Sequence, residues 1–188
     1  MPDHPHSGAP RIPAIPIADA PDEVADILEA WPFNLHRTLA HSPAMMRAWM
    51  VFAEKVLSEN SLSDRDREIV ILRVAWNARS DYEWGMHAFV SRRIGMSEAD
   101  IAAATRDPDA GHWTAKEAAL AKTVDEIMSG WRVSDPTWAV LADHYDHKTL
   151  VDLLMLIGEF LLVALVTNAT RMDLEPKLDT LPPLTEKG

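Results

Sequence analysis

Three ionisable side chains between residues 61 and 95 are of the types that transfer protons. Glu83 and His87 are four residues apart, so a helix places both on one face. Histidine exchanges a proton near neutral pH. Glu68 lies at the start of an apolar run, where a carboxyl group either acquires a raised pKa and acts as an acid or orients the imidazole. We therefore predict Glu68, Glu83 and His87 as catalytic residues.

Neighbouring polar and aromatic side chains are candidates for contact with a substrate. Tyr82 and Trp84 are suited to form the wall of a pocket or to donate hydrogen bonds. The guanidinium of Arg73 is suited to a carboxylate, because the two groups pair through parallel hydrogen bonds. Arg79 is a second candidate for that role. We predict substrate contacts for Ser80, Tyr82, Trp84 and Arg73.

Each candidate also has a structural interpretation. Glu68 lies in the first two turns of its helix, where a carboxylate stabilises the helix dipole. A histidine on an apolar face, such as His87, is often a hydrogen-bonded core residue, and Glu83 is typical of a helix surface. Tyr82 and Trp84 are typical of core or interface packing. The sequence leaves both interpretations open.

Helices must position these residues. The sequence shows helical periodicity and no strand pattern outside a proline-rich arm, so we predict an all-α fold. Ser63 and Asp66 predict an acidic form of the capping box at the start of the central helix. Ser80 or Asp81 begins the next helix, and Gly95 ends it in a left-handed conformation.

We predict further helices in the rest of the chain, within a single domain. They are expected at residues 22–31, 33–40, 44–57, 97–105, 114–130, 134–145 and 148–171. Residues 1–21 hold six of the 13 prolines and predict an extended arm. Residues 22–176 form the helical domain, and residues 177–188 form an extended tail.

Two ionisable features outside the central pair of helices need an interpretation. Glu159 interrupts an apolar helix, and a buried carboxylate needs a partner. We expect a salt bridge or a subunit contact there, in preference to a second catalytic carboxylate. His144 and His147 lie beside acidic residues at a helix boundary, where a solvated turn is favoured over a metal site. We therefore assign no metal.

The composition excludes several classes of function. The net charge is −11, and the basic patch of a nucleic-acid-binding protein is not visible. The chain has no cysteine, which excludes disulfides, thiolate nucleophiles and cysteine-ligated metal centres. No signal peptide is apparent, and the apolar stretch 153–166 is expected to be too short to span a bilayer. We expect a cytoplasmic protein without nucleic-acid or membrane partners.

The sequence from residue 66 to residue 101 resembles the core of the carboxymuconolactone decarboxylase and alkylhydroperoxidase-D-like superfamily. The residues that carry the likeness are Arg67-Glu68, Tyr82-Glu83-Trp84 with His87, and Gly95-Met96-Ser97 with Ile101. The flanking segments extend the likeness to roughly residues 33–176. The resemblance implies an alkylhydroperoxidase-D-like helical bundle that assembles as a homotrimer or homohexamer.

The resemblance also implies one of two activities. Peroxidase-type members use a Cys-x-x-Cys pair with an upstream glutamate and a downstream histidine, and decarboxylase-type members act on a lactone carboxylate without a cofactor. Here Glu68 and His87 occupy the relay positions, whereas Ser80 and Glu83 occupy those of the two cysteines. Neither replacement cycles between thiolate and disulfide, so thiol peroxidase activity is excluded.

Two functional hypotheses remain at this point. The first is a cofactor-independent, decarboxylase-like lyase that uses acid–base catalysis on a small carboxylated lactone or aromatic-catabolite molecule. The second is a non-catalytic or ligand-binding helical oligomer with a vestigial peroxidase-type pocket. The first is favoured by the Glu68–His87 pair and the second by the loss of both thiols.

Overall fold

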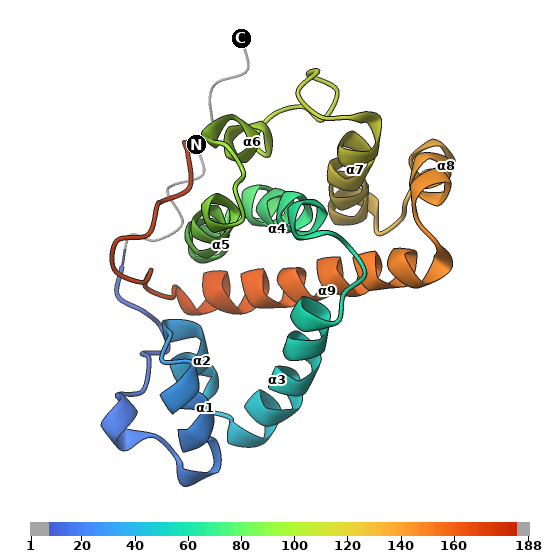
Figure 1. Ribbon diagram of the computed structural model, residues 1–188. Helices are drawn as coiled ribbons and strands as arrows, with labels where there is room; N and C mark the ends of the chain where they lie inside the picture. Colours follow the sequence, from blue (N-terminus) through green and yellow to red (C-terminus); the bar gives the residue numbers. More distant parts are fainter. Residues whose placement is uncertain (1–7, 184–188) are drawn as a thin grey trace.

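The computed structural model describes residues 8–183, and within that range the regular structure is entirely helical (Figure 1). This confirms the predicted all-α fold. Two short 3₁₀ helices, η1 (Ile17–Asp19) and η2 (Asp22–Val24), precede nine α-helices in the described residues. These are α1 (Ala25–Ala30), α2 (Asn34–Leu39), α3 (Pro43–Ser58), α4 (Asp64–Ala78), α5 (Asp81–Arg93), α6 (Glu98–Ala103), α7 (Ala115–Gly130), α8 (Asp135–His144) and α9 (His147–Thr170).

Helix α4 forms the centre of the core. Its apolar residues point in nearly every direction, and Ile69, Ile71 and Leu72 are completely buried. A helix that is apolar all round requires neighbours on all sides. Helices α5, α7 and α9 supply them, with α9 running the length of the molecule beneath α4 and α5 (Figure 1).

The N-terminal caps of α4 and α5 set where these two helices begin, and the helices carry the candidate residues. Ser63 Oγ accepts a hydrogen bond from the backbone N–H of Asp66 at 3.1 Å, as predicted. The Asp66 carboxylate, however, accepts bonds from Lys116 Nζ at 2.7 Å and from the Tyr145 hydroxyl at 2.9 Å. The predicted capping box is therefore half-formed, because tertiary donors take its carboxylate. Ser80 caps α5, and Gly95 follows it with φ +90°.

Helix α9 corrects one expectation. Among the described residues it is the one helix long and apolar enough, by length and composition, to cross a membrane. Half of its most apolar part is nevertheless buried in the protein, against α3, α4 and α5 (Figure 1). Burial of this kind is typical of a core helix.

The segment after α9 folds back across α5. The backbone N–H of Leu181 donates to Asp81 Oδ1 at 3.0 Å, and Asp179 pairs with Arg92 at 2.6 Å. The predicted extended tail is thus attached to the helix that carries Glu83 and His87. The ends of the predicted arm and tail, residues 1–7 and 184–188, lie outside the described residues.

Gly85 allows this close approach. A Cβ atom built there would lie 2.8 Å from the backbone oxygen of Asp179 and 3.0 Å from Leu178 Cβ. We expect Gly85→Ala to lower the free energy of unfolding by about 1–2 kcal/mol, because overpacking outweighs the better helix propensity of alanine. Gly130→Ala is the matched control, since nothing lies within 4 Å of its Cβ position. Chemical denaturation of both variants checks this, and an unchanged Gly85→Ala would contradict it.

Candidate functional site

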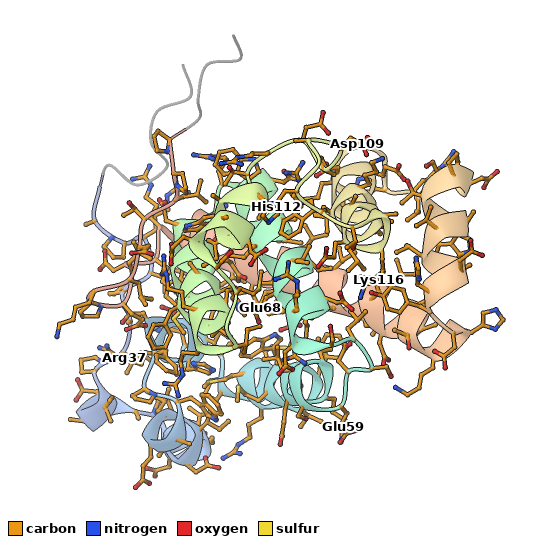
Figure 2. The ribbon with its side chains drawn as sticks, turned by 45° about the horizontal axis from the view of Figure 1, so that its top comes forward. Arg37, Glu59, Glu68, Asp109, His112 and Lys116 are labelled. Carbon is orange, nitrogen blue, oxygen red and sulfur yellow. The ribbon has the colours of Figure 1, made fainter. Side chains whose placement is uncertain are left out.

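Glu68 and His87 form the pair that the sequence predicted. His87 Nδ1 lies 2.9 Å from Glu68 Oε2, and Ser91 Oγ donates to the same oxygen at 3.4 Å. Glu68 lies near the middle of the molecule, where its exposed fraction is 2% (Figure 2). Burial lowers the pKa of His87, but the charge and the hydrogen bond of Glu68 outweigh it, so the pKa is raised above its ordinary value. The imidazole therefore favours its protonated form.

Glu83 lies one helical turn before His87 and is a buried acid. The pKa of its carboxyl group rises to about 8, mainly because the group is buried. The nearby charge of His87 lowers this pKa, whereas the charges of Glu159 and Glu68 raise it. Glu83 Oε2 is buried, and no hydrogen-bond partner reaches it among the described residues. At neutral pH, Glu83 is therefore mostly a neutral acid.

Glu159 lies close to this site, although the sequence favoured a salt bridge or a subunit contact for it. Trp49 Nε1 donates to its Oε1 at 2.7 Å, and the second oxygen is buried without a partner among residues 8–183. The expected salt bridge is absent from the described residues, and the expected subunit contact stays a prediction. Burial raises the pKa of Glu159 to about 7. A carboxylate interrupting an apolar helix was the signal in the sequence.

His87 and Arg67 are the members of the site that solvent reaches. Their side chains are 14% and 17% exposed, whereas that of Glu68 is 2% exposed. Arg67 donates to the exposed Asp64 at 2.9 Å, but its Nε is buried without a partner in the described structure. Its positive charge opposes protonation of His87. The ring of Phe160 meets the imidazole edge-on, with 4.8 Å between centroids.

Arg73 has a structural role, which corrects its predicted contact with substrate. Its Nε and Nη2 donate to the two carboxylate oxygens of Asp125, each at 2.6 Å. Its Nη1 donates to the backbone oxygens of Ala104 at 2.9 Å and Arg106 at 2.6 Å. The guanidinium is occupied, so it ties α4 to α7 and to the loop after α6.

The other predicted contact residues also have partners within the protein. The Tyr82 hydroxyl donates to Glu175 at 3.1 Å and accepts from the backbone of Leu35, away from the pair. Trp84 is buried in the main core. Ser80 is fully buried, caps α5 and shares a 3.1 Å hydrogen bond with Thr167. The structure therefore gives all three a packing or capping role.

Arg79, the second predicted clamp, lies at the far end of α4. Its guanidinium stacks 4.6 Å from the Trp76 ring centre and donates to the backbone of Pro182.

Within residues 8–183, no group of three or more acidic or histidine side chains has the arrangement of a metal site. The site is therefore described by Arg67, Glu68, Glu83, His87 and Glu159.

Residues 43–126 match the sequence model of the carboxymuconolactone decarboxylase family. The central segment of the chain is thus similar to that family. It runs from the first turn of α3 into α7 and contains Glu68, Glu83 and His87. The resemblance predicted from the residues of α4 and α5 is confirmed. A comparison with curated protein sequences finds no match.

Solved structures share the fold at low sequence identity. An uncharacterised peroxidase-related protein from Silicibacter is 17% identical, with a TM-score of 0.76 over 91% of this chain and 96% of that one. An alkylhydroperoxidase AhpD core protein from Ralstonia eutropha is 17% identical, with a TM-score of 0.77 over 90% and 94%. The debrominase Bmp8, in complex with 2,3,4-tribromopyrrole, is 12% identical, with a TM-score of 0.73 over 91% and 94%. The alkylhydroperoxidase-D-like fold is thereby confirmed.

Proposed function

We propose that this protein is a cofactor-independent, decarboxylase-like lyase acting on a small carboxylated lactone or aromatic-catabolite molecule. The observation that carries the proposal is a buried carboxyl group, Glu83, whose Oε2 lacks a hydrogen-bond partner among the described residues and which lies on the same helical face as His87 of the Glu68–His87 pair. Such a site holds protons ready for transfer without a cofactor. The family of the central segment supports the reaction class. The small ring bound by the debrominase relative supports a small cyclic ligand.

Arg67 is the group that we assign to the substrate carboxylate. Its buried Nε lacks a partner among the described residues, and its charge reaches His87. A guanidinium binds a carboxylate through charge-assisted hydrogen bonds. The apolar ring of Phe160 beside His87 limits hydration at this point. Loss of water destabilises the carboxylate relative to neutral carbon dioxide.

The reaction breaks the bond between the substrate carbon and its carboxylate carbon. The bonding electron pair stays on the substrate as an enolate, and carbon dioxide leaves. His87, protonated and held by Glu68, donates a proton to that carbon. The neutral carboxyl of Glu83, one turn away, returns a proton to the imidazole, and solvent then restores Glu83.

The proposal predicts a single alkaline limb in the pH profile. The donor groups act in their protonated forms, and the raised pKa of about 8 for Glu83 keeps it protonated up to that pH. Activity should therefore fall as the pH rises through about 8 and remain high below it. Release of carbon dioxide from carboxymuconolactone and from a panel of aromatic-catabolite acids, measured between pH 5 and 10, tests this. Activity that rises through pH 8 would contradict the acid role.

We also propose that the chain assembles as a homotrimer or homohexamer. Helix α9 exposes a continuous apolar stripe, with Val151 58% and Leu165 69% exposed in the single chain. Large exposed apolar surfaces mark association sites. The wild type should elute well above its 21.0 kDa mass, and Leu165→Glu should shift it to the monomer. Trp131→Glu, at an 81% exposed residue after α7, is the control, and a monomeric wild type would refute the proposal.

The alternative function is a non-catalytic or ligand-binding oligomer with a vestigial pocket. The observation in its favour is that Ser80, at one of the relay-thiol positions, is fully buried and serves as a helix cap. On this alternative, none of the carboxylated substrates reacts, and Glu68→Gln behaves as the wild type in every assay. Turnover of any of them that depends on Glu68 would exclude it.

A further inference from the structure

Glu159 is a buried carboxyl group that the proposed mechanism does not use. It lies in α9, the one helix of the described residues that is long and apolar enough to cross a membrane, and only 3% of its surface is exposed. Its hydrogen-bond partner in the described structure is the indole of Trp49, and no cation is recorded with it there. A carboxyl group in such surroundings lowers stability relative to an apolar side chain. Its presence therefore calls for a function.

The packing of α9 against α5 brings Glu159 to the acid–base site. The next residue, Phe160, contacts the His87 ring, and two turns further along α9 Thr167 binds Ser80. This antiparallel contact sets Glu159 where its charge acts on Glu83. The charged groups that act on Glu83 are His87 on its own helix, Glu68 on α4 and Glu159 on α9.

The two acids differ in their hydrogen bonds. Glu159 receives the N–H of Trp49 from α3, and such a donor favours the ionised carboxylate. Glu83 Oε2 is buried and receives no donor among the described residues, which favours the neutral acid. Of the pair, Glu159 therefore ionises first.

We propose that Glu159 is a positioning residue of this site: the Trp49 indole makes Glu159 the first of the two acids to ionise, and its negative charge then retains the proton on Glu83. The arrangement fixes which of two neighbouring acids carries the proton. Only the catalytic consequence, a proton ready to pass to His87, rests on the proposed function. The proton distribution itself is a property of the resting protein.

Infrared spectroscopy of the carboxyl stretch tests the proposal without substrate. The wild type, titrated from pH 5 to 10, should lose a Glu159 carboxyl band near pH 7 and a Glu83 carboxyl band, missing in Glu83→Gln, near pH 8. In Glu159→Gln the Glu83 band should disappear at a pH about one lower, since a like charge no longer opposes ionisation. In Trp49→Phe the Glu159 band should persist above pH 7, because Glu159 loses its donor.

The two variants act in opposite directions, which keeps the test decisive. If Glu159→Gln fails to fold by circular dichroism, the persistence of the Glu159 band above pH 7 in Trp49→Phe decides alone. An unmoved Glu83 band in folded Glu159→Gln, or a Glu159 band that still disappears near pH 7 in folded Trp49→Phe, would overturn the inference. Band shifts as expected in a protein without lyase activity would support the inference and reject the proposed function.

Discussion

Changing His87 to glutamine is expected to lower the rate of substrate decarboxylation by about 10²- to 10⁴-fold, the usual contribution of a positioned proton donor. Glutamine retains a hydrogen-bonding side chain of similar reach but carries no titratable proton. Its amide N–H is a donor of the kind that His87 Nδ1 offers to Glu68 at 2.9 Å, so we expect the fold to be retained. The loss should appear in kcat, with KM nearly unchanged, because Arg67 binds the carboxylate.

A second histidine provides the control for this substitution. His144 is exposed at the end of α8, so His144→Gln should have wild-type kinetics. Carbon dioxide release under saturating substrate measures both variants. Near-wild-type turnover by a folded His87→Gln would remove His87 from the mechanism and would favour the vestigial-pocket alternative.

Changing Glu83 to glutamine is expected to remove much of the pH dependence of stability. In the folded protein this carboxyl keeps its proton up to about pH 8, against 4.5 for its ordinary value. The folded state is therefore favoured by this group below pH 4.5, and that advantage is lost as the pH rises through 8. The difference corresponds to about 4–5 kcal/mol across the interval. A glutamine side chain does not titrate.

Urea denaturation between pH 4.5 and 9 measures the effect. The free energy of unfolding of the wild type should fall relative to that of Glu83→Gln as the pH rises, with most of the change below pH 8. Glu54→Gln, at an exposed carboxylate on α3, is the control and should follow the wild type. Parallel curves for the wild type and Glu83→Gln would show that Glu83 ionises normally.

The helices and the central pair were predictable because their signals are local. The side chain of a capping residue accepts a hydrogen bond from the backbone N–H three residues later. Ser63 and Ser80 could therefore be identified from the local sequence as the starts of helices. Glu83 and His87 share a helical face through their four-residue spacing alone. Glu68 was identified through its place in the family pattern, and α4 then packs against α5 and brings it to His87.

The roles of Arg73 and Glu159 were not predictable, because long-range partners determine them. The sequence around Arg73 does not show whether its guanidinium contacts a ligand or another residue. In the structure it binds Asp125, which lies 52 residues away in the chain. Glu159 meets Trp49 across 110 residues, and no local pattern connects the two. Arg67 was noted as part of the family pattern, but its unpartnered Nε is visible only in the folded chain.

The segment of residues 174–182, which folds back across α5, bears on when the site can form during synthesis. The segment that lies over Gly85 and binds Asp81 leaves the ribosome after the helix that it covers. Helix α9, which contributes Glu159 and Phe160, precedes it by only a few residues. Helices α4 and α5 thus emerge well before the elements that cover them. The candidate site is completed only after α9 has been synthesised, so a nascent chain halted before α9 lacks it.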